Sequence, residues 1–446
     1  MMPANTVEFI HTLDWAHLPE AVQRQARRCL LDTLGTAIGA HPTELARIIH
    51  DFAAGCYGGQ GAQLWLDGRQ VSPPGAALAN GMTIDALDCH DGHPLTKGHA
   101  GAAVVPALLA TLRLAPAGKV TGAEMLTSLV VGYEIAIRAG MALHATACDY
   151  HTSGAWNALG CASVTARRLG LNAAKTGHAL GIAEYHGPRS PMMRCIEFPT
   201  MVKDGSGWGA MAGVSAGLLA GAGFTGGPAA TVTGRDVRGL WDDLGSHWHI
   251  LDQYFKPHAI CRWAQPAVEG ALVLQQRHNL KPADIERIRI TTFHEATCLA
   301  VVSPATTEEA QYSLPFPVAA ALVHGGLGAA ALSGKGLTDP MVLDLARRVE
   351  LVEDAGLGAR FPRERLAHIE LWARDGRYFE LREARPRWDA ADPPSDAELT
   401  AKFHWLATGV IPSARASALE TMVWDSPALP DANALVDLLA PKPAES

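Results

Sequence analysis

The chain has 446 residues, of which 48% are hydrophobic and 18% charged, and its formal net charge is −8. This composition is typical of a globular protein and excludes an intrinsically disordered one. The negative charge, together with the lack of any Lys/Arg run in the sequence, argues against nucleic acid as a partner.

Eight cysteines are spread along the sequence without a CxxC pair. Their spacing argues against an iron–sulfur cluster, a structural zinc site and a disulfide framework. The N-terminal residues contain acids and no cationic stretch followed by an apolar run, so we expect no signal peptide. We also expect no membrane span, because no stretch of about 18 apolar residues is free of polar interruption. The sequence therefore predicts a cytoplasmic protein.

The first part of the chain, to about residue 265, predicts helices. They are expected over Val22–Gly39, Gly122–Leu143, Gly154–Arg168 and Ser206–Gly221. The last three are rich in Ala and Gly and apolar on nearly every side, which is typical of helices inside a bundle. Since none of these segments alternates with a period of two, we predict an all-α domain here.

The pattern changes after about residue 280. Alternation of arginine and isoleucine over Glu286–Phe293 predicts a half-buried strand. His368–Leu381 predicts a β-hairpin, with Asp375–Gly376 as a two-residue turn. Between these strands, Pro317–Leu332 and Asp339–Val352 are predicted to be helical. This stretch is therefore expected to form an α+β unit.

A Pro-rich segment leads to Asp396–Ala407, which is predicted to be a helix that packs back on the first domain. The fold class is accordingly predicted as mainly α, with two domains. A large all-α helical-bundle domain would comprise residues 1–266 together with residues 397–446. A smaller α+β lid domain would comprise residues 267–396.

The segment of residues 83–101, TIDALDCHDGHPLTKGHAG, has an unusual density of titratable side chains: three His, three Asp and one Lys. Its glycines and proline prevent a continuous helix, so we predict an ordered loop after a helix. Loops held by a rigid scaffold often carry function.

Three interpretations of this loop remain open. Its polar side chains could cap helix ends and bond to one another. Asp88, His90, Asp91 and His93 could bind a metal ion, although no helical HxxxH pair fixes a geometry. The interpretation we favour is an acid–base site, because histidine titrates near neutral pH and Lys97 beside it could orient a carboxylate or act as a base.

Three more clusters could join this loop. Tyr150–His151 precede a helix of small residues, and Lys203 precedes another helix start, where a cation could help bind an anion. The segment FKPHAICR places Lys256, His258, Cys261 and Arg262 at the predicted domain boundary. Domain boundaries are favoured places for ligand pockets.

These segments, in this order, resemble the MmgE/PrpD family. The resemblance extends over nearly the whole chain, through LDTLGTAIGA, ALDCHDGHP, GHAGAAVVPALLA, GYEIAIRAG, YHTSGAWNALG, MVKDGSGWGA, FKPHAICR, QYSLPFPVAAAL and LTAKF. It implies a large all-α domain and a smaller α+β lid, a homodimer, and no metal or organic cofactor. It also implies an active site in the cleft between the two domains.

The resemblance implies that Asp88, His99, His151, Lys203 and Lys256 occupy active-site positions. The sequence departs from the common family pattern at four positions. These are Gly92, Lys97, Cys261 and Phe316. The departures leave dehydration, decarboxylation and epimerisation open.

The function we predict is abstraction of a proton α to a carboxylate of a small di- or tricarboxylic acid, without a cofactor. His99 and His151 are the predicted acid–base pair, Asp88 would orient an imidazole, and Lys97 would be a second base in an epimerase. The predicted substrate-binding residues are Lys203, Lys256, Asp91, Tyr150 and Arg262.

The overall reaction depends on the step that follows proton abstraction. Loss of a β-hydroxyl would make the protein a dehydratase, and loss of CO2 a decarboxylase. Return of the proton on the other face would make it an epimerase of an amino- or imino-dicarboxylate such as iminodisuccinate. A non-catalytic homologue that binds a carboxylate is the remaining alternative.

Overall fold

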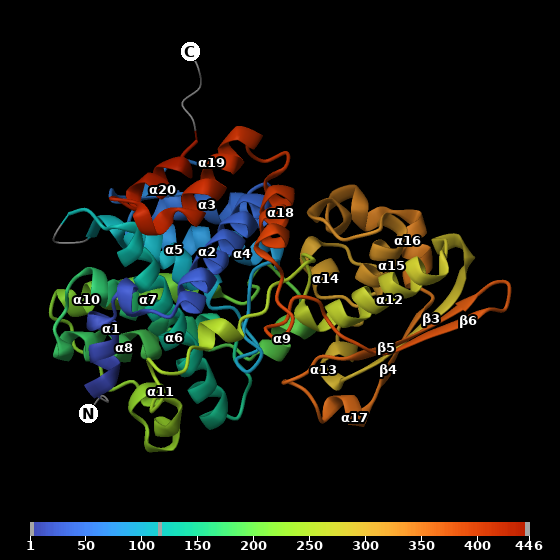
Figure 1. Cartoon of the computed structure of the whole chain (residues 1–446), viewed down its shortest axis with the longest axis horizontal. Helices are drawn as coiled ribbons and strands as arrows, with labels where there is room; N and C mark the ends of the chain where they lie inside the picture. The colour runs from blue at the N-terminus through green and yellow to red at the C-terminus, as the bar shows by residue number, and fades with distance from the viewer. Residues whose placement is uncertain (1–3, 115–117, 442–446) are drawn as a thin grey trace, which may run out of the picture.

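The computed structural model describes residues 4–114 and 118–441. It is 59% helical and 9% strand, so the predicted mainly-α fold class is confirmed. Figure 1 shows a large helical part and, beside it, a smaller part that contains a β-sheet. The ends of the predicted helical domain, residues 1–3 and 442–446, lie outside the described residues.

The helical part is built mostly from the first 250 residues. Its helices are α1 (Ala4–Thr12), α2 (Glu20–Ala40), α3 (Glu44–Cys56), α4 (Pro73–Leu87), α5 (Gly101–Thr111), α6 (Gly122–Thr146), α7 (Gly154–Arg168), α8 (Ala173–His186), α9 (Met192–Glu197), α10 (Ser206–Gly221) and α11 (Ala230–Thr233). A two-stranded ribbon of β1 (Ala62–Gln63) and β2 (Gln70–Val71) lies between α3 and α4. The four helices predicted from the sequence correspond to α2, α6, α7 and α10.

Small residues let α7 and α10 approach each other closely. A Cβ atom on Gly209 would lie 2.4 Å from the Gly154 carbonyl oxygen, and one on Gly213 would lie 2.4 Å from that of Ala158. Side chains larger than glycine would push the two helices apart. This contact brings the N-terminus of α7 beside that of α10, and with it Ser153 beside Asp204.

Helix α6 is the longest helix of the described chain and lies in the middle of the helical part. By length and composition it is apolar enough to cross a membrane, but 94% of its most apolar window is buried inside the protein. A Cβ atom added to Gly132 would lie 2.4 Å from Val104, and one added to Gly140 would lie 2.9 Å from Trp156, so neighbouring helices pack tightly on α6. Its apolarity is thus explained by burial in a protein core.

The second part of the structure begins with α12 (Gln265–His278) and β3 (Ile285–Thr292). It continues through α13 (His294–Thr297), α14 (Thr307–Gln311), α15 (Pro315–His324), α16 (Pro340–Ala346), β4 (Val349–Glu353), α17 (Ala355–Gly358), β5 (Ala367–Ala373) and β6 (Tyr378–Ala384). The sheet order is β4–β3–β5–β6, with β4 parallel to β3 and the other pairs antiparallel.

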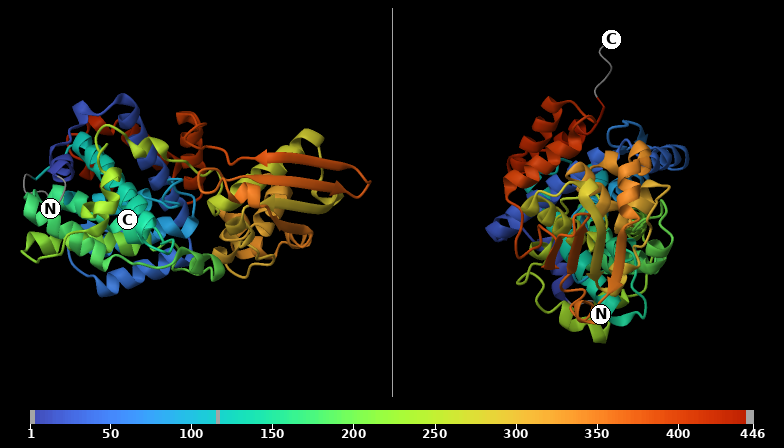
Figure 2. Two further views of the ribbon diagram at one scale, coloured as in Figure 1. Left: turned by 90° about the horizontal axis from the view of Figure 1, so that it is seen from below. Right: turned by 90° about the vertical axis from the view of Figure 1, so that its right-hand side faces the viewer.

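One face of this sheet is covered by helices. Ile288, Ile369 and Leu371 are buried on it, and Ile369 reaches within 2.6 Å of the Cβ position of Gly270 in α12. The right-hand view of Figure 2 looks onto the strands from the end of the molecule. The alternation in β3 and β5 follows from this arrangement, because one face meets the core and the other meets solvent.

Two predicted helices of this part are wrong in their second halves. Residues 349–352 form β4 and not a helix end, because Val349 and Leu351 pair in parallel with Ile288 and Ile290. The helix predicted to reach residue 332 ends at His324, where Gly325 takes a φ of +75°. The apolar residues of β4 would suit a helix or a strand, and their pairing with β3 selects the strand.

The hairpin of β5 and β6 is confirmed, but its turn has three residues and not two. Ala373 and Arg377 form the closing pair, and the amide of Gly376 donates to the Ala373 carbonyl over 2.9 Å. Gly376 takes a φ of +87°, a conformation that glycine adopts without a steric penalty. A three-residue loop that ends in a left-handed glycine is the common alternative to the two-residue turn.

After the sheet, the chain returns to the helical part with α18 (Asp396–Ala407), α19 (Ser413–Trp424) and α20 (Asn433–Leu438). Gly35 and Gly39 of α2 allow the approach of Phe403 and Leu406 of α18, whose side chains would each lie 3.0 Å from a Cβ atom added to the facing glycine. The predicted helix Asp396–Ala407 and its packing on the first part are thus confirmed. The domain boundaries at residues 266/267 and 396/397 stay a prediction.

Candidate active site

A small cavity lies where the helical part meets the sheet-containing part. Its volume is about 20 Å³, room for about one water molecule. The loop of residues 88–100 contributes Asp88, Lys97 and His99. The segment that enters the second part contributes Tyr254, Lys256, Cys261 and Arg262, and the second part itself contributes Tyr312 and Arg365.

The loop of residues 88–100 is held in one conformation by backbone contacts. Gly92 exchanges two hydrogen bonds with Tyr254, of 3.0 and 2.8 Å, and the amide of His93 donates to the Gly98 carbonyl over 2.8 Å. A Cβ on Gly92 would lie 2.5 Å from the Tyr254 hydroxyl and 2.7 Å from Nδ1 of His99. Gly92 is therefore required by the packing of the site.

Asp88 and Lys256 form a buried ion pair. Nζ of Lys256 donates to Oδ1 of Asp88 over 2.7 Å and to its backbone oxygen over 3.1 Å. Burial opposes ionisation of Asp88, but the charges of Lys256 and Lys203 outweigh it and hold the pKa of this carboxyl below its usual value. Both partners therefore stay charged within the protein.

His99 is a buried imidazole that is neutral at physiological pH. Burial, followed by the charge of Lys256, lowers its pKa to about 3. Its Nδ1 donates to the backbone oxygen of Asp91 over 2.6 Å, which leaves Nε2 as the basic nitrogen. Within the described ranges Nε2 has no hydrogen bond, and it lies 4.0 Å from Oδ2 of Asp204. This nitrogen can accept a proton.

Behind His99 lies a group of buried acids. Ser153 Oγ donates to Oδ2 of Asp204 over 2.5 Å and accepts from the backbone amide of His99 over 3.0 Å. Burial raises the pKa of Asp204 to about 6. Burial, followed by repulsion from Asp204, raises the pKa of Asp85 to about 8. At neutral pH Asp85 therefore holds its proton, whereas Asp204 is mostly ionised.

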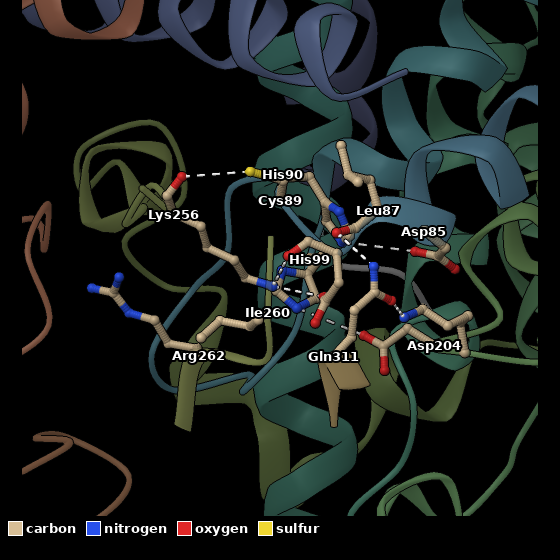
Figure 3. Close-up of polar contacts among 12 residues, drawn as sticks. Asp85, Leu87, Cys89, His90, His99, Asp204, Lys256, Ile260, Arg262 and Gln311 are labelled. Atoms are coloured by element: carbon tan, nitrogen blue, oxygen red, sulfur yellow. Dashed lines mark hydrogen bonds and ion pairs between the residues drawn. The ribbon is translucent and has the colours of Figure 1, made fainter. Parts of the chain in front are cut away.

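Lys203 is a buried cation in the same region. Its Nζ bonds to Oε1 of Gln311, and it lies 4.6 Å from the centre of the Tyr312 ring. The amide of Gln311 also donates to the carbonyls of Ala86 and Leu87 over 3.1 Å each. Gln311 thus bridges the second part to the end of α4, and Figure 3 shows it approaching His99 from the side opposite Lys256.

Lys97 and Arg365 line the cavity on its other side. Nζ of Lys97 lies 4.0 Å from the centre of the Tyr150 ring, and the Tyr150 hydroxyl bonds to the Lys97 carbonyl. Burial lowers the pKa of Lys97. Arg365 donates to the carbonyls of Pro362 and Pro94 over 2.8 and 3.2 Å. Arg365 therefore ties the second part to the loop of residues 88–100.

Two predicted site residues, His151 and Asp91, do not line the cavity, and a third is paired with another residue. His151 is part-exposed, and its Nδ1 donates to the Asp149 carbonyl over 2.8 Å. The Asp91 carboxylate accepts from the Tyr133 hydroxyl over 3.0 Å, so Asp91 meets His99 only through its backbone. Arg262 lines the cavity, but its guanidinium bonds to Asp389, and Figure 3 shows its side chain directed away from His99.

The four residues considered for a metal do not come together. Asp88 and His90 have ligand atoms within 4.8 Å of one another and of one in His99. His93, in contrast, lies with His249 and Asp252. In the part of the chain that the structure covers, neither ring nitrogen of the buried His90 has a hydrogen-bond partner.

Sequence reasoning missed several residues of the site. They are Ser153, Asp204, Tyr254, Gln311, Tyr312 and Arg365. Asp204 follows Lys203 directly and could have been found from that position. Gln311 and Arg365 carry no local signal, because only the docking of the second part on the first brings them to the cavity.

Comparison with known proteins places this arrangement in a family. The profile of the MmgE/PrpD N-terminal domain matches residues 4–247, and that of the MmgE/PrpD C-terminal domain matches residues 258–426. The chain belongs to the MmgE/PrpD family. The resemblance seen in the sequence is thereby confirmed.

Three known relatives match nearly the whole chain. Cis-aconitate decarboxylase of Mus musculus is 26% identical over 457 residues, which span 96% of this chain and 91% of the relative. The enzyme of Homo sapiens is 26% identical over 98% of this chain and 94% of its own length. A cis-aconitate decarboxylase-like protein of Aspergillus oryzae is 24% identical over 98% and 97%. The chain is thus an MmgE/PrpD-type enzyme of the lyase kind.

Proposed function

We propose that this protein is a lyase acting on a small tricarboxylic acid, by decarboxylation or dehydration, with His99 as the proton-transferring group. The observation that carries the proposal is a surplus of positive charge around a neutral imidazole. Among the residues described, Lys97, Lys203 and Arg365 have no carboxylate within ion-pair distance, although Lys97 and Arg365 line the cavity.

Unpaired cations in a buried site are costly unless a ligand supplies the opposite charge. Lys256 is already neutralised by Asp88, which leaves three cations for the substrate. Two carboxylates would neutralise Lys97 and Arg365 in the cavity, and a third would be directed toward Lys203, which lies behind the cavity residue Tyr312, so this set of cations favours a tricarboxylate over a dicarboxylate. The names of the relatives, cis-aconitate decarboxylases, support the same class.

The chemistry follows from the same positions. If a substrate C–H bond breaks, its proton passes to Nε2 of His99 and the electron pair moves into an enolate that the cations stabilise. Departure of a β-hydroxyl with a proton then completes a dehydration. If instead a C–C bond breaks and CO2 leaves, the electron pair remains on carbon and is quenched by a proton from the site. Return of the proton to the opposite face would give an epimerase, for which Lys97 is the second base available near His99.

Isotope incorporation separates these outcomes. The protein is incubated in D2O with cis-aconitate, methylcitrate and iminodisuccinate in turn, and products are followed by NMR and mass spectrometry. One deuteron in a product shortened by CO2 indicates decarboxylation, exchange in recovered substrate with an alkene product indicates dehydration, and deuterium at an inverted centre indicates epimerisation. Turnover of neither cis-aconitate nor methylcitrate would contradict the proposal, and turnover of iminodisuccinate alone would favour the epimerase.

Two variants test the residues. His99→Gln is expected to slow turnover at least about 100-fold, in line with the usual contribution of general acid–base catalysis. Lys203→Met is expected to slow it as well. His186→Gln, at the exposed C-terminal end of α8, is the matched control and should leave turnover unchanged. Turnover that survives in both His99→Gln and Lys203→Met would contradict the assignment.

We also propose that the protein works as a cytoplasmic homodimer without nucleic-acid or membrane partners. Two neighbouring aromatic side chains that are exposed on the helical part support self-association. Phe52 of α3 and Trp208 of α10 are about 40% exposed, and their rings lie 6.4 Å apart. Light scattering of the wild type and of Trp208→Lys would test this, since a monomeric wild type would contradict it.

A further inference from the structure

Three histidines and one aspartate converge outside the active-site cavity. His93 comes from the loop of residues 88–100. His247, His249 and Asp252 come from the segment just before Tyr254, the residue that pairs with Gly92 of this loop. Oδ2 of Asp252 lies 3.1 Å from Nδ1 of His249, 3.5 Å from Nε2 of His247 and 3.9 Å from Nε2 of His93. The cluster therefore has one carboxylate oxygen as its centre.

The inner member of this cluster, His93, has one ring nitrogen without a hydrogen-bond partner among the described residues. His93 is fully buried, and its Nε2, which points at Asp252, has no hydrogen bond to any described residue. On its other side, the Thr96 amide is 3.4 Å from Nδ1, at the outer limit of a hydrogen bond, so this contact does not fix the tautomer. A buried nitrogen without a partner costs free energy unless something else binds it.

The spacing of the ligand atoms suits a metal ion. Two ligands of a tetrahedral zinc ion lie about 3.3 Å apart when their bonds are about 2.0–2.1 Å long. The three distances to Asp252 bracket this value, and ligand atoms of His93, His249 and Asp252 all lie within 4.8 Å of one another. Small side-chain rotations would close the group around one ion.

We propose that His93, His249 and Asp252, with His247 as the fourth ligand, bind a divalent transition metal ion of the zinc class. Imidazole nitrogens with one carboxylate oxygen are a ligand set that zinc accepts. The outer members give the ion a route from solvent, because the side chains of His247 and Asp252 are 52% and 42% exposed. This site is independent of the proposed lyase chemistry.

The position of the site indicates a structural role. His93 follows Gly92, which pairs with Tyr254, and Asp252 lies two residues before Tyr254. A bound ion would therefore cross-link the loop that carries Asp88 to the segment that carries Lys256. Such a cross-link stabilises the folded state, because the unfolded chain does not assemble the ligands.

The test uses purified full-length protein, stripped with a chelator and dialysed. Zn2+ is titrated by calorimetry, Co2+ is followed by its visible absorption, and Tm is measured with and without Zn2+. The wild type should bind one equivalent, show the intense visible bands of tetrahedral cobalt, and gain thermal stability. The variants His249→Gln and Asp252→Asn should bind at least about 100-fold more weakly, since even outer-shell changes cost 10–100-fold.

Two controls keep the outcome interpretable. The side chain of Asp252 is 42% exposed and that of His249 is largely buried, so circular dichroism and Tm without metal are measured for both variants and should match the wild type, which shows that they fold. His404→Gln removes another histidine that pairs with a carboxylate, Glu420, and should not change metal affinity. Wild type that binds neither ion would overturn the proposal. So would equal binding by wild type and variants, which would place the ion on the cysteines or on Asp88, His90 and His99.

Discussion

Nζ of Lys256 lies 2.7 Å from Oδ1 of Asp88, and both side chains are buried. The pair joins the end of α4 to the segment that leads into the second part of the structure. Because Asp88 neutralises Lys256, the cations available to a ligand are Lys97, Lys203 and Arg365. The pair of Asp88 and Lys256 therefore stabilises the structure of the site.

Removal of one partner of this pair should destabilise the protein strongly. In Lys256→Met the Asp88 carboxylate would be buried without its counter-charge, and the expected loss is about 3–5 kcal/mol in the free energy of unfolding. Urea unfolding measures it. The double variant Asp88→Asn/Lys256→Met should recover part of the loss. A surface pair is the control: Arg113→Met, opposite the exposed Asp437, should stay within error of the wild type.

His99 should make stability depend on pH in a defined window. Its pKa is about 3 in the folded protein, and an unperturbed histidine has a pKa of about 6.5. Between these two pH values the unfolded chain binds one more proton than the folded protein does. The contribution of neutral His99 to the free energy of unfolding is therefore complete above pH 6.5 and is lost as pH falls toward 3. Relative to His99→Gln, the wild type should lose about 1.4 kcal/mol per pH unit there. Urea unfolding at pH 7, 6 and 5 would refute this if the two curves ran parallel.

Lys97 should contribute to substrate affinity. Lys97→Ala removes a cation that lines the cavity, and a hydrogen bond to a charged group contributes about 1.5–3 kcal/mol, so KM should rise about 10- to 100-fold. Lys97→Arg should retain part of the affinity. The exposed Lys281 provides the control, because Lys281→Ala should leave KM unchanged. A change in kcat alone would instead favour Lys97 as a proton-transferring group.

The cavity should open before it can bind substrate. Its volume of about 20 Å³ does not hold a tricarboxylate. Cys261 lines it, and burial raises the pKa of this thiol to about 12. Alkylation of Cys261 should therefore be much slower than that of the exposed Cys56 and Cys148. Tricarboxylate should slow it further, as mass spectrometry of the peptides would show. Equal rates for all three thiols would mean that the cavity stands open.

The sequence predicted most of the fold because helices here follow local rules. Gly154–Arg168 and Ser206–Gly221 are apolar all round and end as predicted. Val349–Glu353 escaped prediction because a five-residue parallel strand depends on its partner β3, which lies more than fifty residues earlier. Local pattern does not contain that information.

The sequence predicted the part of the site whose titratable residues lie close together in the chain. The loop of residues 88–100 was found from its His, Asp and Lys content, and it does supply Asp88, Lys97 and His99 to the cavity. His151 was expected beside them but bonds to the Asp149 carbonyl. Side-chain direction at a helix start depends on packing, which the sequence does not display.

Arg262 has a consequence for how the cavity can open. Its guanidinium donates to the carbonyls of Phe255 and Arg387 over 3.0 Å each and pairs with Asp389. Arg262 thereby joins the connection that enters the second part, at Phe255, to the connection that returns from it, at Arg387 and Asp389. An opening of the cavity between the two parts would have to break the contacts of Gln311 with Leu87 and of Arg365 with Pro94, which join the same two parts. Because Arg365 belongs to the second part and Lys97 to the first, a movement that opened the cavity would also separate these two cations.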